Sequence, residues 1–166
     1  MVIIVKLVFN SSPLIFLARL GLIENVIEHF ENYNLYLPTA VANEVAVKSD
    51  QASISIKRLI ESQQLEVQNI NLISLANSLN ERLGKGESDA IVLAIELQTD
   101  YIILDDAAAR KEAMRLGLNV KGTLAIIRLL QKQQKISIKD TDDFYKKLMK
   151  INFRIKRTIF NQIFKD

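Results

Sequence analysis

The stretch VIIVKLVFNSSP, residues 2–13, decides the fold class of this chain. Residues 2–9 are apolar apart from Lys6, which is typical of a strand buried on both faces of a parallel sheet. Polar residues then end the strand. Ser12 followed by Pro13 predicts a helix that starts there, because serine favours the N-cap and proline the first helical position. A strand, a short turn and a helix open a β-α-β arrangement.

The same alternation of strands and helices continues along the chain. Strands are predicted at residues 35–37, 101–104 and 118–120, with a minor strand at 65–67. The predicted helices lie between them and cover residues 13–20, a segment starting at Thr39, 52–63, 71–83, 87–98, 107–116 and a segment starting near Leu124. This order predicts an α/β fold, a three-layer α/β/α sandwich with a central parallel sheet.

Length and composition agree with one compact domain over residues 1–166. The chain has 166 residues, of which 49% are hydrophobic and 25% charged, and no Pro-, Gly- or Ser-rich stretch marks a linker. The longest hydrophobic run is residues 90–95, whereas a membrane span needs about 20 apolar residues. The N-terminus is a poor secretory signal. We therefore expect a cytoplasmic protein with no membrane partner.

The residue inventory restricts the chemistry. The sequence has no cysteine, and His29 is its only histidine, which argues against disulfides, zinc sites of the Cys/His type and a Ser-His-Asp triad. We interpret His29 as a surface or boundary residue. A metal site in this chain has to be built from oxygen ligands.

Charge is unevenly distributed along the chain. Residues 1–127 hold 11 basic and 15 acidic side chains, whereas residues 128–166 hold 11 basic and 4 acidic ones. We expect about residues 128–166 to form a basic helical segment, with an amphipathic helix over 151–164. Such a segment attracts a polyanion such as nucleic acid, although a solvated helix face has the same composition. The candidate nucleic-acid contacts there are Lys146, Lys147, Lys150, Arg154, Lys156 and Arg157.

Oxygen-bearing side chains follow the predicted strands. Asn10 follows the first strand, Glu44 lies one turn into the helix after the second, and Asp105 and Asp106 follow the strand at 101–104; Glu87 starts a helix nearby. Ligands of such folds bind beyond the carboxyl ends of the strands, where these residues are expected to meet. Clustered carboxylates suit a hard cation such as Mg²⁺ or Mn²⁺.

Each of these residues also has a purely structural explanation. A negative charge at Glu87 is favourable in the first turn of a helix, and Asp105 or Asp106 is a natural N-cap. Glu44 fits a solvent-facing helix position, and Asn10 fits a turn. The individual residues leave both interpretations open.

The ordered set of motifs resembles the PIN domain. The resemblance covers roughly residues 2–130 and is closest to small stand-alone prokaryotic members, similar to the toxin ribonucleases of toxin–antitoxin pairs. The motifs that carry it are NSSPLI at residues 10–15, PTAVANEV at 38–45, GESDAI at 86–91, LDD at 104–106 with Arg110, and Gly122-Thr123.

The resemblance implies a Mg²⁺- or Mn²⁺-dependent ribonuclease. By position, the metal ligands would be Asn10, Glu44, Glu87 and one or both of Asp105 and Asp106. Ser11, Ser12 and Thr123 would orient water or ligands, Asp89 would lie just outside the ligand set, and Arg110 would contact an RNA phosphate or pair with a nearby acid. A toxin role would imply a small antitoxin as partner, and the family also makes a homodimer an expectation.

One departure from the family pattern concerns Asn10. The family has a carboxylate at this position, and asparagine offers only a neutral carbonyl oxygen. Weaker metal binding and slower hydrolysis are therefore expected, and a PIN-fold protein that binds nucleic acid or a partner without catalysis is the main alternative. A phosphotransfer receiver also places adjacent aspartates after a strand, but its acidic pair comes after the first strand, whereas this one comes late.

Overall fold

The computed structural model describes residues 3–166, and its centre is a five-stranded sheet whose pairings are all parallel. Val8 of the central strand pairs with Tyr36 on one side and Ile102 on the other. The strand order is β3-β2-β1-β4-β5, with β1 at Lys6–Phe9, β2 at Asn34–Pro38, β3 at Glu66–Gln68, β4 at Tyr101–Ile103 and β5 at Val120–Lys121. The predicted parallel sheet is confirmed.

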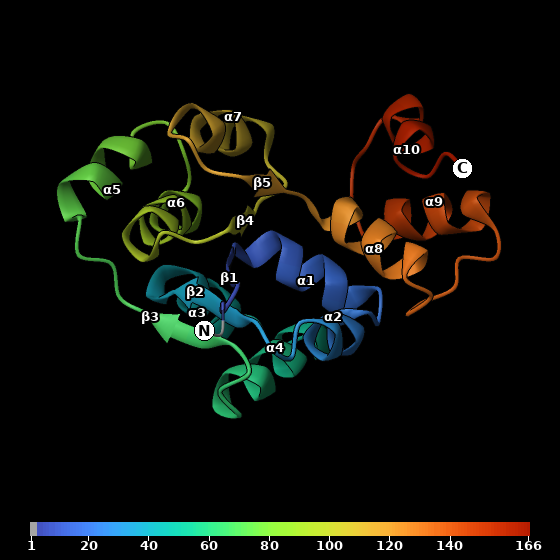
Figure 1. Ribbon diagram of the computed structural model, residues 1–166, viewed down its shortest axis with the longest axis horizontal. Coiled ribbons are helices and arrows are strands. Elements are labelled where there is room, and N and C mark those ends of the chain that lie inside the picture. The colour runs from blue at the N-terminus through green and yellow to red at the C-terminus, as the bar shows by residue number, and fades with distance from the viewer. Residues whose placement is uncertain (1–2) are drawn as a thin grey trace.

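Ten helices surround this sheet in the described part of the chain. They are α1 (Ser11–Arg19), α2 (Ile23–His29), α3 (Thr39–Ala46), α4 (Gln51–Glu61), α5 (Ile73–Asn80), α6 (Lys85–Leu97), α7 (Ala107–Arg115), α8 (Thr123–Lys132), α9 (Thr141–Lys150) and α10 (Arg157–Ile163). Figure 1 shows α5, α6 and α7 on one side of the sheet and α1, α2, α4 and α8 on the other.

The alternation of side chains along β1 builds these layers. Val8 is buried in a cluster with residues of α5, α6 and α7, whereas Leu7 and Phe9 face the larger cluster that includes α1, α2, α4 and α8. Successive strand residues point to opposite faces, so an unbroken apolar strand is covered on both. The predicted α/β/α sandwich is confirmed.

The first strand and helix differ from the predicted boundaries. β1 begins only at Lys6, and the predicted start at Val2 lies outside the described residues. Helix α1 begins at Ser11, with Asn10 rather than Ser12 at the N-cap position. Pro13 is thus the third helical residue. This costs no hydrogen bond, because the first four N–H groups of a helix have no intrahelical acceptor.

Other boundaries shift by one to three residues, and one helix was missed. Strand β4 ends at Ile103, and β5 covers 120–121 instead of 118–120. Helix α5 is shorter than the predicted 71–83, α6 begins two residues early at Lys85, and α2 was not predicted. The stability of a short helix depends more on its packing against other elements than on helix propensity, so its ends are difficult to predict from sequence.

The basic C-terminal segment forms two short helices rather than one amphipathic helix over 151–164. Helix α9 ends at Lys150, Asn152 adopts a left-handed φ of 62°, and the chain becomes helical again only at Arg157. Phe160 is fully buried in the larger core cluster. The segment therefore packs against the rest of the fold. Within residues 3–166, no helix combines the length and the apolar character that crossing a bilayer requires.

Candidate active site

Asn10 lies at the carboxyl end of the central strand. Its backbone N–H donates to the carbonyl of Ile103, 3.2 Å away, which holds the ends of β1 and β4 together. The side chain is 4% exposed, and its Oδ1 is buried without a hydrogen-bond partner among the described residues. Leaving a buried carbonyl oxygen unsatisfied costs free energy, so this atom is suited to receive a ligand.

Glu44 projects from α3 onto the start of α6. The Ser11 hydroxyl donates to Glu44 Oε2 over 2.5 Å, which ties the carboxylate to the helix that follows Asn10. On the other side, a Cβ added to Gly86 would overlap the carboxylate, with Glu44 Cδ only 2.8 Å away. The bare backbone at Gly86 therefore makes room for the Glu44 carboxylate.

Glu87 lies in the first turn of α6, where the backbone N–H of Gly84 donates to its Oε2 over 3.3 Å. Burial raises the pKa of Glu87, and the negative charges of Asp106 and Glu44 raise it further, against the lowering effect of the Gly84 hydrogen bond. The charges of Glu44 on α3 and of Asp106 after β4 thus act on Glu87 at the start of α6.

The two adjacent aspartates have different environments. Asp105 uses both carboxylate oxygens, since the backbone N–H of Thr123 donates to Oδ1 over 2.8 Å and its hydroxyl to Oδ2 over 2.6 Å. Burial raises the pKa of Asp105, while the Thr123 hydrogen bonds and the charge of Arg110 oppose that effect. Asp106 caps α7 by accepting from the Ala109 N–H over 2.9 Å with Oδ1 alone.

These positions fit a hard cation in their donor chemistry. Glu44, Glu87 and Asp106 each use one oxygen in the hydrogen bonds above, and the second accepts none within residues 3–166. Asn10 adds the unpartnered Oδ1. In that part of the chain, no three His, Cys, Asp or Glu side chains lie close enough together to form a metal cluster. The four positions thus offer free oxygen donors without forming a close cluster of acidic side chains in the described chain.

The residues expected to support the ligands have mixed surroundings. Ser11 and Thr123 contact Glu44 and Asp105 directly. Ser12 is partly buried in α1. Asp89 is buried and pairs with Lys85 over 2.9 Å, and its Oδ1 has no partner in the described chain.

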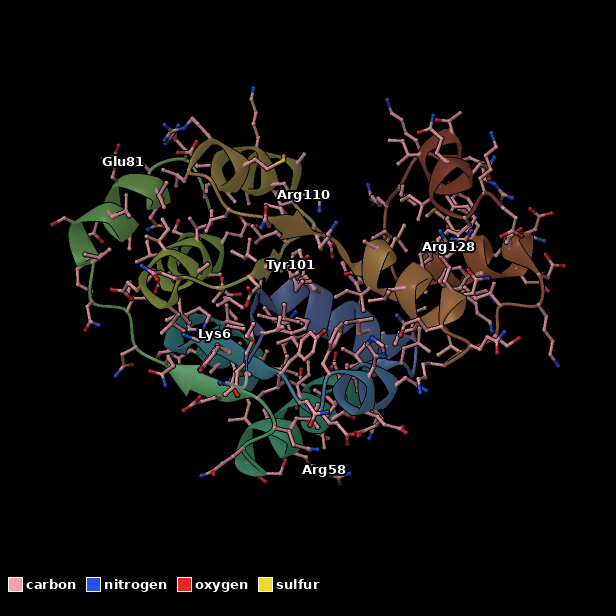
Figure 2. All side chains as sticks on the ribbon, viewed as in Figure 1. Lys6, Arg58, Glu81, Tyr101, Arg110 and Arg128 are labelled. Carbon is pink, nitrogen blue, oxygen red and sulfur yellow. The ribbon has the colours of Figure 1, made fainter. Side chains whose placement is uncertain are left out.

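A cleft of about 460 Å³ lies at the end of β4, and Asp105 is the one candidate site carboxylate among the described residues that line it. One wall contains Asp105, Arg110 and Gly122, and the opposite wall is the connection between α9 and α10 with Arg154 and Lys156. Arg110 donates to the carbonyl of Leu104 over 2.8 Å, so its guanidinium is held at the end of β4 (Figure 2). The cleft brings three cationic side chains, Arg110, Arg154 and Lys156, into the same pocket as Asp105.

The remaining basic candidates lie away from this cleft. Lys146, Lys147 and Lys150 belong to α9 and are not among the residues that line it. Arg157 hydrogen-bonds to Asp142 and stacks on Tyr145, with its guanidinium carbon 4.6 Å from the ring centroid. Arg157 thus has a structural role in joining α9 to α10.

Sequence reasoning missed two kinds of functional position. Gly86 and Gly122 were noted only as parts of motifs, yet a Cβ on Gly122 would lie 2.9 Å from Arg110 Nη1 and 3.1 Å from Asp105 Oδ1. The apolar side chains of Phe153, Ile155 and Ile159, which complete the cleft wall, were also missed. Only the glycines carried a signal, because each directly precedes a polar site residue.

Comparison with known proteins identifies the family of this chain. No curated protein matches the sequence. Among solved structures, the chain is similar to a PilT N-terminus domain protein from the hyperthermophilic archaeon Sulfolobus solfataricus P2, with 19% identity over 81% of this chain and 98% of that one and a TM-score of 0.47. A model of the PIN domain family, whose members are commonly metal-dependent nucleases, matches residues 6–166. The chain therefore belongs to the PIN domain family.

Proposed function

We propose that this protein is a metal-dependent ribonuclease that hydrolyses RNA phosphodiester bonds. The observation that carries the proposal is that Glu44, Glu87 and Asp106 each keep one oxygen free of a hydrogen bond, that the charges of Glu44 and Asp106 act on Glu87, and that Asn10 Oδ1 is buried without a partner in the described chain. Because Asp105 already binds Thr123 with both oxygens, we assign the ligand role to Asp106 and a positioning role to Asp105.

The side chains have separate tasks in this proposal. Glu44, Glu87, Asp106 and Asn10 would hold Mg²⁺ or Mn²⁺, which when bound polarises a phosphate oxygen and acidifies a water. Ser11 orients Glu44, and the Gly84 N–H orients Glu87. Asp105 joins the end of β4 to the start of α8 through its hydrogen bonds to Thr123. These bonds fix the position of the segment that carries Asp106 and Arg110, and Arg110 lines the cleft.

The cleft that Asp105 lines supports binding of an RNA backbone. Arg110, Arg154 and Lys156 line it, and cationic side chains of this kind neutralise phosphates without reading sequence. The Asp105 carboxylate faces the same cleft and limits its positive charge. The phosphate groups of the substrate are thus expected to lie along the wall formed by residues 154–156.

Replacing Arg154 and Lys156 together by alanine tests this binding mode. We expect affinity for a fluorescent single-stranded RNA in chelator to fall, and the slope of log K against log salt to shrink by about 0.7 for each lost phosphate contact. Fluorescence anisotropy over a salt series measures both. The exposed pair Lys132 and Lys139, changed to alanine, is the matched control. Equal slopes in all three proteins would contradict the assignment.

A PIN-fold protein that binds RNA or a partner without cleaving it is the second candidate. Asn10 favours it, because a neutral amide at the carboxyl end of β1 removes one negative charge from the proposed metal site. If the protein is the toxin of a toxin–antitoxin pair, its small antitoxin would block the cleft. A homodimer, expected from the family, is also part of the proposal.

The wild type and Asn10→Asp, compared side by side, distinguish the two candidates. We expect the wild type to cleave a mixed RNA pool with Mn²⁺ or Mg²⁺ and not with chelator, and Asn10→Asp to bind Mn²⁺ more tightly and cleave faster, because a carboxylate attracts the cation more strongly than an amide does. Gel analysis of the RNA and calorimetric titration with Mn²⁺ give the two readouts.

The outcomes of this comparison separate clearly. Cleavage only by Asn10→Asp would identify the wild type as a binding protein. Equal Mn²⁺ affinity and equal rates in the two proteins would contradict a ligand role for Asn10. Without metal, Asn10→Asp should also unfold at a lower temperature, because the new carboxylate is buried where only 4% of the side chain reaches solvent.

A further inference from the structure

Most of the side chains that line the cleft at the end of β4 are apolar, and contacts to phosphate do not account for them. Five of them form what we call the apolar patch: Leu124 and Ala125 of α8, Phe153 of the connection between α9 and α10, and Ile159 and Ile163 of α10. Phosphate groups bind to cations and N–H donors, so an RNA backbone leaves this patch unused. The cleft therefore suits a ligand that is partly anionic and partly apolar.

Helix α10 presents apolar side chains in two directions. Phe160 and Phe164 are buried in the larger core cluster, whereas Ile159 and Ile163, which precede them by one residue each, line the cleft. Ile159 is 46% exposed and belongs to neither core cluster of the described chain. Burial of a large apolar side chain is favourable, and the fold alone leaves Ile159 without that contribution. A ligand in the cleft is in position to cover it.

The connection between α9 and α10 is held in place by side chains outside the cleft. The Tyr145 hydroxyl donates to the carbonyl of Ile155 over 2.9 Å, and the Arg157 guanidinium lies over the Tyr145 ring, 4.6 Å from its centroid. Arg154 and Lys156, on either side of Ile155, are exposed and form no ion pair within residues 3–166. The cleft thus holds available cations next to the apolar patch.

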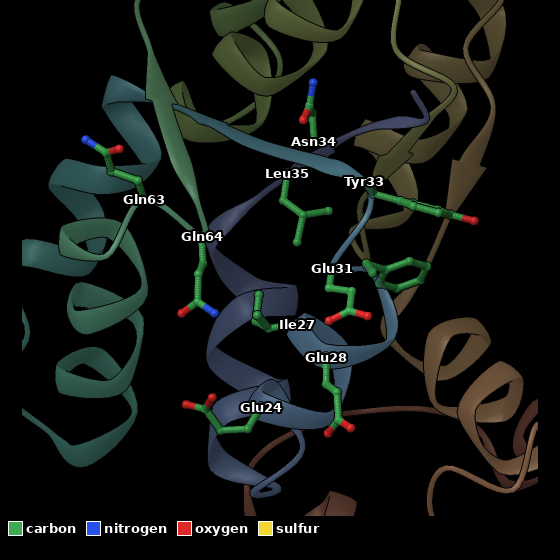
Figure 3. A pocket seen from close by; sticks show the side chains of 10 residues that line it. Glu24, Ile27, Glu28, Glu31, Tyr33, Asn34, Leu35, Gln63 and Gln64 are labelled. Carbon is green, nitrogen blue, oxygen red and sulfur yellow. The ribbon is translucent and has the colours of Figure 1, made fainter. Parts of the chain in front are cut away.

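Another hollow of the molecule has the opposite charge. It measures about 550 Å³ and is lined by the exposed side chains of Glu24, Glu28 and Glu31. Figure 3 shows these carboxylates along one side of the hollow. The single carboxylate among the described residues that line the cleft, Asp105, already accepts hydrogen bonds from Thr123 with both oxygens. A polyanion is therefore repelled by the glutamates and attracted to the cleft.

We propose that the apolar patch binds the base of an unpaired RNA nucleotide whose phosphate lies against Arg154 or Lys156. This inference rests on the proposed function, because it takes the ligand of the cleft to be RNA. A nucleotide joins an anionic phosphate to a flat base with two apolar faces, which is the combination that the cleft offers. Proteins commonly hold unpaired bases against aromatic or apolar side chains and contact the phosphates with cations. Ile159, as the most exposed large side chain of the patch, would carry much of the contact.

Two probes of the same length separate base binding from phosphate binding. One is a short fluorescent single-stranded RNA, and the other is its abasic counterpart, which keeps the sugar-phosphate chain and lacks the bases. In chelator, we expect the wild type to bind the RNA at least about fivefold more tightly than the abasic chain, the difference that contacts to one stacked base produce. Fluorescence anisotropy measures both dissociation constants.

Substitutions in the cleft should change the two affinities differently. Ile159→Ser removes apolar contact area, so the preference for RNA over the abasic chain should fall to about twofold or less, with the abasic chain bound as before. Ile159→Phe keeps an apolar surface and should retain the preference. Arg154→Ala combined with Lys156→Ala should weaken binding of both probes by similar factors. Ile73→Ser, at a 53% exposed position of α5 that does not line the cleft, is the control and should match the wild type.

The possible results distinguish this inference from the proposed function. Equal affinity of the wild type for the two probes would overturn the inference and leave RNA binding through phosphates intact; the apolar patch would then be a surface for a partner protein. Binding of neither probe would overturn the proposed RNA binding and the inference with it. A preference that Ile159→Ser retains in full would place the base elsewhere and also overturn the inference. Circular dichroism verifies that each variant folds, and the comparison of the two probes on the wild type requires no variant.

Discussion

Glu87→Gln is expected to lower the rate of metal-dependent RNA cleavage by at least about 100-fold. Removing a group that only supports a metal ligand already costs about 10- to 100-fold, and Glu87 is proposed as a ligand itself. Glutamine keeps the oxygen that accepts from the Gly84 N–H, so the start of α6 is retained. It loses the negative charge. Cleavage assays with Mn²⁺ and Mg²⁺ measure the effect, and Glu81→Gln, at an exposed position outside the site, is the control.

The same substitution should stabilise the metal-free protein at neutral pH. The pKa of Glu87 is raised in the fold, mainly by burial and then by Asp106, so the folded state holds its proton more tightly than the unfolded state does. Wild-type stability therefore falls as pH rises from about the ordinary glutamate value of 4.5 through the raised pKa. Glutamine has no such titration.

Thermal unfolding in chelator provides the check. The melting temperature of Glu87→Gln should exceed that of the wild type at pH 7, and the difference should shrink towards zero at pH 4, where Glu87 is protonated in both states. Added Mn²⁺ should then stabilise the wild type more than the variant. A variant that is less stable than the wild type at pH 7 in chelator would show that Glu87 is not destabilised by its neighbours.

Gly86→Ala is expected to reduce cleavage about as severely while leaving the fold intact. The added methyl would occupy the space of the Glu44 carboxylate, which has to move away from Ser11. The backbone tolerates alanine, because Gly86 lies inside α6, and alanine is favoured over glycine in a helix by about 1 kcal/mol. In this variant the cleavage rate should therefore fall while the melting temperature stays close to that of the wild type.

Gly84→Ala is the matched control for this experiment. A Cβ at Gly84 would lie 3.8 Å from the nearest atoms of Glu87, which is ordinary contact. RNA cleavage and Mn²⁺ titration of both variants, with thermal unfolding beside them, should show a loss of activity and metal affinity only in Gly86→Ala. Full activity of Gly86→Ala would mean that catalysis does not require the Glu44 carboxylate to lie where the structure places it.

Boundary errors in the sequence-based expectations have a common cause. The strand at 2–9 was predicted from its apolar run, and within residues 3–166 the strand covers Lys6–Phe9, whose register partners on β2 begin at Asn34 and on β4 at Tyr101. The helix predicted over 151–164 forms only over Arg157–Ile163, because the left-handed Asn152 follows the end of α9 and the next helix begins only at Arg157. The pattern of hydrophobic residues indicates which residues are buried. Where a strand or helix ends depends on the strand or helix that packs against it.

The sequence by itself determined the α/β sandwich, the parallel sheet and the strand ends at which Asn10, Asp105 and Asp106 lie. These follow from local apolar periodicity and from turn residues that act within a few positions of each other. Only the tertiary structure shows that the two aspartates differ in environment, since Asp105 is satisfied by Thr123, 18 residues later, while Asp106 keeps one oxygen free of a hydrogen bond. It also decided that Gly86 makes room for Glu44 and that residues 153–156 form the far wall of the cleft. Such contacts depend on how distant segments pack, and no local pattern records them.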